Sequence, residues 1–338
     1  MQKVEKINIK VLDKSSTLGD SYLKFKIESP QIDHIIANTI RRVMLANIPI
    51  YAFNEFKFEK NTGVLHNDYI KQRLRHLPIW TIDNTVDTLD FVHKNMPIKE
   101  NVIMEENEDN EFNMEVEKNI NISSLKQLTL YVNFKNKTNE IVSVTTDDAN
   151  FYYEEKQISS PYKTAIPLVK LQPNQEIAFS AITKIGVEEE NAMYSAVCIG
   201  AYKMINPNTF EFNIESRGQI TEKRILQVVL INIEKQLKNF MKLLKDDSAK
   251  IKLDEKNNEG MIVVNNEDHT LGNLIARGMQ MHKKISFAGY NLPHPRVKKV
   301  HFHYKHEDGA NIIKIIEDVV DYYTEIFSDI KKLVDKEI

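Results

Sequence analysis

Three histidines are the first residues whose type and spacing could support chemistry. His301, His303 and His306 lie in the alternating run VHFHYKH, and residues two apart on a strand share a face, an arrangement that metal ligation can use. The sequence places no thiol or pair of carboxylates beside them to complete a coordination sphere, and Lys305 adds a repelling charge. The pattern therefore favours a solvated strand face, and we assign no metal ligand and no cofactor.

Cys198 and the pair His66 and Asp68 are two further candidates. Cys198 lies among apolar residues in YSAVCIGAY, which is typical of a small buried thiol rather than of a nucleophile. His66 and Asp68 could form an acid–base pair, but residues two apart on a loop or at a helix start seldom face each other, which favours a structural role. Because Cys198 is the single cysteine, an internal disulfide, a cysteine-based zinc site and an iron–sulfur cluster are excluded, and a reducing compartment is expected.

Catalytic motifs with a fixed spacing are absent from the 338-residue sequence, which has no phosphate loop, no nucleophile elbow and no H-E-x-x-H. The balance of 45 basic against 48 acidic residues disfavours non-specific nucleic-acid binding by the chain alone. No run of about 18 apolar residues occurs, so we expect neither membrane insertion nor secretion. The composition, 42% hydrophobic and 28% charged, predicts a globular protein.

The N-terminal fifty residues predict a hairpin followed by a helix. Residues 5–28 read as two strands around a turn, with one buried side. Ser29 and Pro30 form the usual pairing of a capping hydroxyl with a first-turn proline, and Asp33 adds a carboxylate near the positive end of the helix dipole. The predicted helix therefore begins at Ser29 and ends before Pro49. Its apolar stripe consists of Ile32, Ile35, Ile36, Ile40, Val43 and Met44.

Residues 51–197 form a stretch of different composition, rich in Asn, Thr, Asp and Glu. Short alternating runs at 128–134 and 176–182 indicate a mostly β domain. The acidic segment 105–117 is interpreted as a solvated loop that runs into a strand, because charge blocks are usually hydrated rather than used for recognition.

Two long helices are predicted towards the C-terminus, at 221–245 and 310–336. Their apolar residues recur every three or four positions, which is typical of a helix packed along its length against another helix. Because the sequence has no other apolar seam of comparable length, we expect these two helices to pack together. The predicted seam consists of Leu226, Val229, Ile233, Leu237, Phe240, Ile312, Ile316, Val319, Tyr323 and Ile326.

A short internal repeat relates the two ends of the chain. Asn38–Met44 and Asn273–Met279 agree at alternate positions, and each run lies in a capped helix that follows a strand and a turn, with Thr270 as the expected second cap. The order of elements around both runs is the same. An α+β fold follows, in which two related units pair about a pseudo-twofold axis within one chain.

The repeat also predicts the domain boundaries. Residues 1–50 and 198–245 form the first, discontinuous dimerisation domain, and residues 248–338 form the second. The mostly β stretch 51–197 is then an insertion within the first domain.

Together these pieces resemble the α-like assembly subunits of multisubunit DNA-directed RNA polymerases. The first portion is similar to the third subunit of RNA polymerase II and to archaeal D, and the last 90 or so residues are similar to the eleventh subunit and to archaeal L. The motifs that carry the first resemblance are IRRVML (40–45), NTGVLHNDYI (61–70), PLVKL (167–171) and FEFNIESRG (210–218). The second resemblance rests on DHTLGNLI (268–275) and FAGYNLPHP (287–295).

The resemblance implies a noncatalytic assembly platform. In that family the two subunits pair through their dimerisation domains and hold the second-largest polymerase subunit, after which the largest subunit docks and small zinc-binding subunits join. DNA is reached only through the assembled enzyme. The residues carried over to the large-subunit interface are Arg41, Arg42, Asp68 and Arg73. Arginines off the buried stripe suit an interface because their forked donors bind carboxylates, and the alternative is that Arg41 and Arg42 are simply solvated.

Two departures from the family pattern matter. Some relatives carry a cysteine cluster for zinc or iron–sulfur in the inserted domain, and this sequence has none. The run QRLRHLP (72–78) stands where the family usually reads HRLGLIP, which adds charge. Fusion of both units in one chain resembles the enzymes of large nucleocytoplasmic DNA viruses, for which the host cytoplasm and the virion are the expected locations; a cellular protein would be intracellular.

Two other functions stay open as alternatives. A freestanding regulator could bind DNA or a transcription factor with its twofold platform, although the equal numbers of basic and acidic residues in 248–338 disfavour DNA. A hydrolase or transferase would need a motif that the sequence does not contain.

Overall fold

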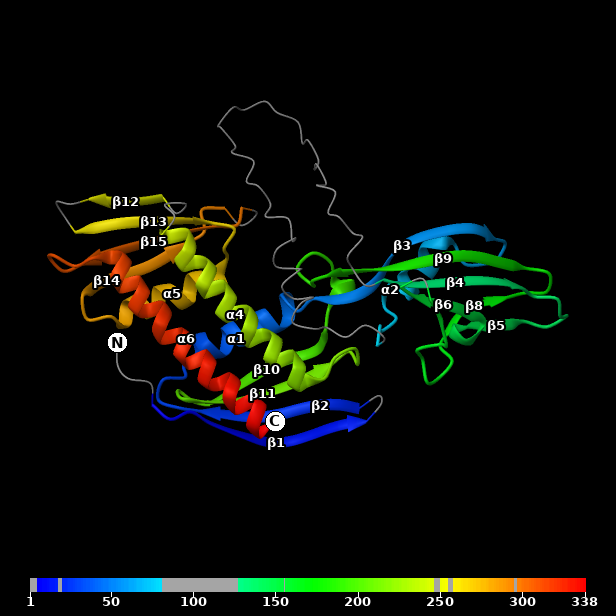
Figure 1. Ribbon diagram of the computed structural model, residues 1–338, viewed down its shortest axis with the longest axis horizontal. Helices are drawn as coiled ribbons and strands as arrows, with labels where there is room; N and C mark the ends of the chain where they lie inside the picture. The colour runs from blue at the N-terminus through cyan, green and yellow to red at the C-terminus, as the bar shows by residue number, and fades with distance from the viewer. Residues whose placement is uncertain are drawn as a thin grey trace, which may run out of the picture.

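The polypeptide forms antiparallel sheets with helices packed between two of them (Figure 1). This computed structural model describes residues 5–17, 20–80, 127–154, 156–245, 250–254, 258–294 and 297–338. Helices and antiparallel strands are mixed along the chain, which confirms the predicted α+β class. The acidic segment 105–117 lies outside the described residues.

The first unit is a four-stranded sheet covered by two helices. Its strand order is β1-β2-β11-β10, and all neighbours are antiparallel. The strands are β1 (Asn8–Thr17), β2 (Asp20–Glu28), β10 (Val197–Asn206) and β11 (Thr209–Ser216), and the helices are α1 (His34–Ala46) and α4 (Glu222–Lys245).

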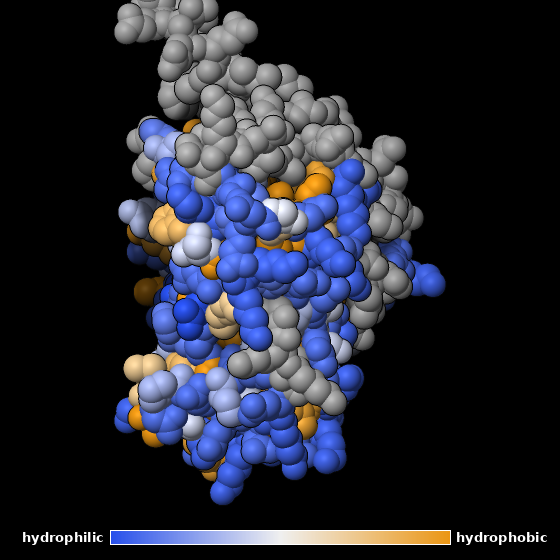
Figure 2. All heavy atoms as spheres, turned by 90° about the vertical axis from the view of Figure 1, so that its left-hand side faces the viewer, coloured by the Kyte–Doolittle hydropathy of each residue, from blue (hydrophilic) through white to orange (hydrophobic). Residues whose placement is uncertain are grey.

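The second unit repeats this architecture. Its strand order is β12-β13-β15-β14, so each strand occupies the place of its counterpart in the first sheet. The strands are β12 (Lys250–Asp254), β13 (Glu259–Asn265), β14 (Ile285–Asn291) and β15 (Lys299–His306), and the helices are α5 (His269–Met281) and α6 (Ile312–Glu337). Figure 2 shows the face at the left-hand side of Figure 1. This surface is largely hydrophilic, with apolar residues in small groups.

The insertion in the first unit has strands, a short helix and a core of its own. Its larger sheet has the order β3-β9-β4-β6-β7, and β5 pairs with β8 in a second, two-stranded sheet. The strands are β3 (Ile50–Asn61), β4 (Leu128–Lys135), β5 (Val142–Thr145), β6 (Ala149–Tyr153), β7 (Lys156–Ile158), β8 (Pro167–Leu171) and β9 (Glu176–Gly186). Helix α2 (Asn67–Arg75) packs against β3 and β8. Phe53, Leu130 and Phe179 belong to this separate core.

Both short helices begin at an aspartate rather than at the predicted hydroxyl caps. Asp33 has extended backbone angles and its carboxylate accepts hydrogen bonds from the amides of Ile35 and Ile36, so α1 starts at His34 and not at Ser29. In α5 the cap is Asp268, which accepts from the Thr270 amide. The predicted caps, Ser29 and Thr270, were wrong because an aspartate carboxylate in the right backbone conformation also accepts hydrogen bonds from the free amides of the first turn.

The two long helices pack against each other in antiparallel orientation, between the two sheets (Figure 1). Near one end, Lys223 and Gln227 of α4 donate to Asp335 of α6, at 3.0 and 2.7 Å. Near the other end, Lys245 lies 2.9 Å from Glu317. Because each helix also faces a sheet, its buried surface is wider than one seam and takes in Ile225, Val228, Leu230, Ile315, Val320 and Phe327.

All ten residues of the predicted seam are buried in a single core that both units share. None of them is more than 9% exposed. None of the described helices has the length and apolar composition needed to cross a membrane.

Candidate functional site: the interface between the two units

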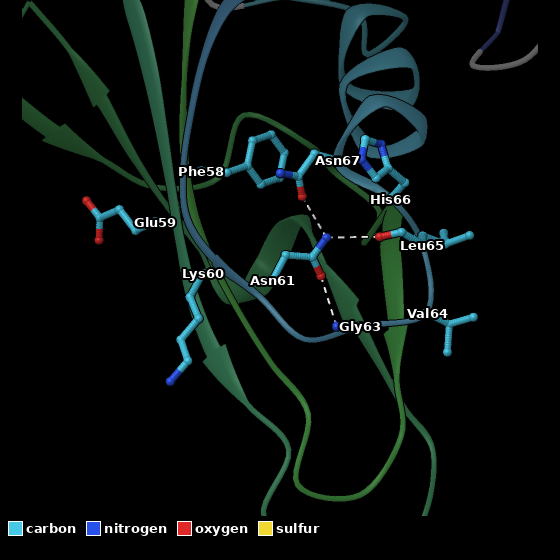
Figure 3. A pocket seen from close by; sticks show the side chains of 9 residues that line it. All are labelled: Phe58, Glu59, Lys60, Asn61, Gly63, Val64, Leu65, His66 and Asn67. Carbon is cyan, nitrogen blue, oxygen red and sulfur yellow. Dashed lines mark hydrogen bonds between the residues drawn. The ribbon is translucent and has the colours of Figure 1, made fainter.

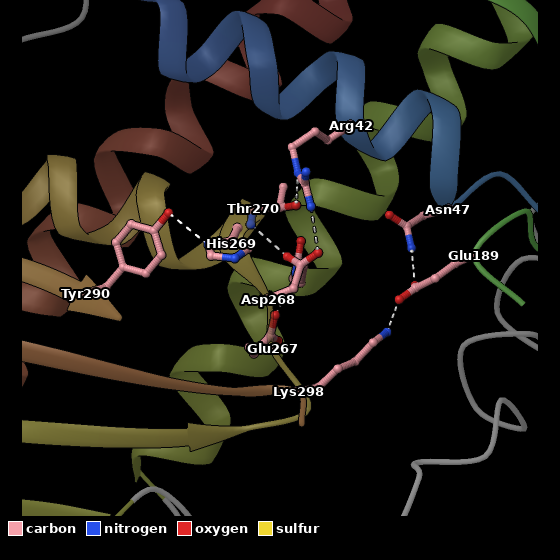
Figure 4. A network of polar contacts seen from close by, with 10 residues as sticks. Arg42, Asn47, Glu189, Glu267, Asp268, His269, Thr270, Tyr290 and Lys298 are labelled. Atoms are coloured by element: carbon pink, nitrogen blue, oxygen red, sulfur yellow. Dashed lines mark hydrogen bonds and ion pairs between the residues drawn. The ribbon is translucent and has the colours of Figure 1, made fainter. Parts of the chain in front are cut away.

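An arginine from the first unit binds the helix cap of the second. The Arg42 Nη2 atom lies 3.1 Å from Asp268 Oδ2, and its Nε atom donates to Thr270 Oγ1 at 2.9 Å (Figure 4). Asp268 thus accepts from its own helix and from α1 at once. The contact holds the N-terminus of α5 against α1.

An equivalent contact runs in the opposite direction, from the second unit to the first. Arg277 of α5 donates from Nε to Asp33 Oδ2, the cap of α1, at 3.3 Å. Both helices have 13 residues, so aligning the two caps pairs Arg42 with Arg277. The two salt bridges are therefore related by the pseudo-twofold axis. All four side chains keep between 22% and 40% of their surface exposed, so each pair contributes about 1 kcal/mol or less.

A second polar contact joins the two units and the insertion (Figure 4). Glu189, in the loop that follows β9, accepts a hydrogen bond from Asn47 at the end of α1 and forms an ion pair with Lys298, in the loop before β15. Asn232 of α4 donates to the Asn47 carbonyl at 2.8 Å. These contacts tie the loop of the insertion to the paired units.

A carboxyl group just before α5 is buried and bonds to α4. Glu267 is 9% exposed, and its Oε2 atom accepts a hydrogen bond from Gln236 Nε2 at 2.7 Å. Burial raises the pKa of Glu267 to about 8, an effect that the bond from Gln236 opposes in part. Near neutral pH this group therefore holds its proton.

A glycine allows α5 and α6 to approach closely. A methyl group added at Gly278 would lie 2.3 Å from Val319 Cγ1 and 2.8 Å from Tyr323 Cε2. Both neighbours are fully buried. Only glycine fits at this crossing, because a packed core cannot move aside without losing contacts elsewhere.

The predicted large-subunit interface divides into two places. Arg42 forms a contact with Asp268 within the chain, as described above, and its assignment to an outside partner stays a prediction. Arg41 donates to Asn38 of its own helix at 3.1 Å. Asp68 and Arg73 lie on α2, in the insertion, and the structure does not bring them to the arginines of α1.

The loop before α2 is held by one asparagine. The Asn61 amide donates to the Leu65 carbonyl at 2.9 Å and to Asn67 Oδ1 at 2.7 Å, and its own oxygen accepts from the Gly63 amide (Figure 3). The loop lines a surface hollow and holds the Val64 side chain in solvent, 70% exposed. Asn61 therefore gives this part of the motif NTGVLHN a fixed shape.

Helix α2 presents a mixed polar and apolar surface. His66 caps the helix by accepting from the Asp68 amide, and its Nδ1 atom lies 3.3 Å from Asp68 Oδ2. The expectation that these two side chains seldom meet is therefore wrong, because the cap geometry turns His66 towards the first turn. The bond from Lys71 lowers the pKa of Asp68. Tyr69 is 68% exposed beside them, and Arg73 donates to the Pro167 carbonyl at 2.7 Å.

Cys198 is exposed, contrary to the buried position that its neighbours predicted. It lies on β10, an edge strand of the first sheet, where apolar residues such as Ile199 also face solvent. His303 bonds to Asn291 at 2.9 Å and its ring packs against that of His301. Within the described ranges, no three His, Cys, Asp or Glu side chains gather in a metal-binding cluster.

Sequence reasoning missed the two aspartate caps and the role of Arg277. The repeat itself contains the signal, since extending the aligned runs towards the N-terminus pairs Asp33 with Asp268. The contact between an arginine of one copy and the cap of the other requires the pseudo-twofold arrangement, which a one-dimensional alignment does not contain.

The fold and the interface define a class of protein: two α+β dimerisation units that share one core, with a β insertion in the first. Residues 26–129 and residues 259–333 each match the RNA polymerase Rpb3/Rpb11 dimerisation domain. The chain therefore belongs to the family of RNA polymerase subunits built on that domain, and it carries the domain twice.

Relatives include a viral protein that matches along nearly its whole length. A DNA-directed RNA polymerase subunit of Acanthamoeba polyphaga mimivirus is 26% identical over 98% of this chain and 94% of its own length. The rpb3 subunit of Dictyostelium discoideum RNA polymerase II is 26% identical over 51% of each chain. The RPAC2 subunit of RNA polymerases I and III of Caenorhabditis elegans is 33% identical over 21% of this chain and 49% of its own. The chain thus spans about half the length of these cellular relatives.

Proposed function

We propose that this chain is the assembly platform of a viral multisubunit DNA-directed RNA polymerase. It docks the second-largest and then the largest subunit, and it carries out no chemistry itself. Small zinc-binding subunits join the same platform, and DNA is reached only through the assembled enzyme. The host cytoplasm and the virion are the places where such an enzyme works.

The observation that carries the proposal is the internal pairing of two Rpb3/Rpb11 dimerisation domains. A pair that is made within one chain needs no second subunit to complete its core. Its outer surfaces are then available to larger partners. The mimivirus relative, with the same two-unit length, supports a viral polymerase.

The docking surface that we propose lies on the insertion, at the loop 61–67 and α2. Val64 and Tyr69 are large apolar side chains in solvent, and Asp68 and Arg73 supply charges of both signs beside them. Such a mixture is typical of the buried centre and polar rim of a protein interface. Arg41, half-exposed on α1, is a second contact.

Co-purification tests this assignment. The chain is expressed with the two large polymerase subunits and captured by a tag, with Tyr69→Ala combined with Asp68→Lys as the variant. We expect the variant to lose most of the large subunits while its melting temperature changes little, because both side chains are exposed and the ion pair of Asp68 with Lys71 is a surface pair. Tyr131→Ala, at an exposed tyrosine of β4, is the matched control and should retain them. Full retention by the α2 variant would remove this surface from the proposal, and absence of both large subunits from the unmodified chain would overturn the platform itself.

A further inference from the structure

The two sides of the pseudo-twofold interface differ in chemistry at the buried position of Glu267. Glu267 directly precedes the cap of α5, and its counterpart before the cap of α1 is Ile32. The long helices align from their first residues, Glu222 and Ile312, because their buried positions then coincide almost throughout. In this alignment, the counterpart of Gln236 on α4 is Ile326 on α6.

One side is therefore a hydrogen-bonded polar pair and the other is apolar. The buried Glu267 accepts from the half-buried Gln236 at 2.7 Å. Ile32 and Ile326 are both completely buried in the shared core. A polar group that is buried with its partner is stable, whereas the same group set against a hydrocarbon loses its hydrogen bond without regaining water.

The two arginine–aspartate salt bridges cannot tell one pairing from another. Each unit offers both an arginine and a cap aspartate at equivalent positions, so a unit paired with a copy of itself would form the same two bridges. The seam is apolar in both helices as well. Discrimination between pairings must come from contacts that differ across the axis.

We propose that the contact between Glu267 and Gln236 is the specificity determinant that pairs the two unlike units and rejects the pairing of either unit with its own counterpart in a second copy of this chain. If two copies paired through their second units, Glu267 of each would face Ile326 of the other. If they paired through their first units, Gln236 of each would face Ile32. Single buried polar groups select partner and register in other helical interfaces by this penalty on wrong pairing.

The test equalises the two sides and measures exchange between chains. Full-length protein with Gln236→Ile and Glu267→Ile is prepared with two different tags, and the two forms are unfolded together and refolded at high concentration. Capture on one tag then reports how much of the other tag follows. The tether keeps most chains paired internally, so the readout is the minor cross-captured fraction. We expect this fraction to rise about tenfold over the unmodified chain.

The reversed pair, Gln236→Glu with Glu267→Gln, is the matched control. It restores a carboxyl and an amide in contact and keeps the two sides unlike, so its cross-capture should stay at the level of the unmodified chain. Equal cross-capture by the unmodified chain and the isoleucine variant would overturn the proposal.

A second variant covers the case in which the isoleucine variant does not fold. Ile32→Glu with Ile326→Gln equalises the two sides in the opposite direction, with a polar pair on each. Raised cross-capture by this variant supports the proposal, and cross-capture at the level of the unmodified chain contradicts it.

Discussion

The paired units and the insertion bury their apolar residues in different ways. The units share one core, to which α4 of the first and α6 of the second contribute on equal terms, whereas the insertion closes a core of its own between its sheets and α2. A unit that lacks its partner would expose one side of its long helix. Pairing is therefore part of folding in this chain, while the insertion is an attached module that can lend its surface to other proteins.

The largest effect is expected when this shared core receives a charge. Ile316 is 1% exposed. Ile316→Asp removes a buried apolar side chain and places a carboxylate among apolar neighbours, which should lower the free energy of unfolding by about 4 kcal/mol. Chemical denaturation measures the loss. Hydrogen exchange should show α4 and α6 losing protection together, while β4 and β9 of the insertion retain theirs.

Ile313→Asp is the control on the same helix, because Ile313 is 37% exposed. We expect a change of about 0.5 kcal/mol or less. Equal losses of protection in the insertion and in the long helices of the Ile316 variant would contradict the division into two cores.

A smaller loss is expected where α5 crosses α6. Gly278→Ala forces a methyl group against Val319 and Tyr323, and we expect a loss of about 3 kcal/mol. Gly289→Ala on β14 is the control, since its nearest contact is an ordinary one, 3.5 Å from Phe287. If Gly278→Ala melts at the temperature of the unmodified chain, the two helices do not pack as closely as described.

The buried carboxyl makes stability depend on pH. The folded chain holds the Glu267 proton up to a pH of about 8, whereas an unfolded glutamate releases it near 4.5. Between these values the folded state binds more protons, so stability falls as pH rises. Asp268 and Glu189 favour the protonated form and Lys298 opposes it. Glu267→Gln should reduce the fall by roughly 3 kcal/mol between pH 5 and pH 8. Denaturation at a series of pH values measures the stability of both proteins. The same dependence of stability on pH in the unmodified chain and the variant would contradict a raised pKa of Glu267.

The smallest effect belongs to the salt bridges. A double-mutant cycle with Arg42→Ala and Asp268→Ala should give a coupling of about 1 kcal/mol or less, because both side chains are more than a third exposed. The coupling should weaken as salt is added. Coupling of several kcal/mol would mean that these bridges, and not the apolar seam, hold the two units together.

Much of the paired core could be predicted from sequence, because its signal is periodic. Helical spacing alone selected ten seam residues that the structure buries in one core. The additional buried residues, such as Val228 and Phe327, were missed because a single stripe describes a helix with one covered face, and these helices have two. The observed helix caps differed from the predicted ones because serine, threonine and aspartate are all favoured at the N-cap position. The backbone conformation decides which of them caps the helix.

The site was harder to predict than the fold. Arg41 and Arg42 are neighbours on one helix. Local patterns do not reveal that Arg42 bonds to the second unit while Arg41 bonds to Asn38 of its own helix. Cys198 was assigned to the core on its apolar neighbours, but most side chains of β10, the edge strand on which it lies, are exposed. These outcomes depend on long-range pairing, which local patterns do not encode.

Cross-linking within the monomer tests the pairing of the two units most directly. Gln227→Cys and Asp335→Cys are introduced together in a Cys198→Ser background, since the two native side chains touch across α4 and α6 at 2.7 Å. A short bismaleimide should then link the two new thiols within one chain, and the product should run as a monomer. Cross-linked dimers, or no cross-link under conditions in which both thiols react, would contradict the internal pairing.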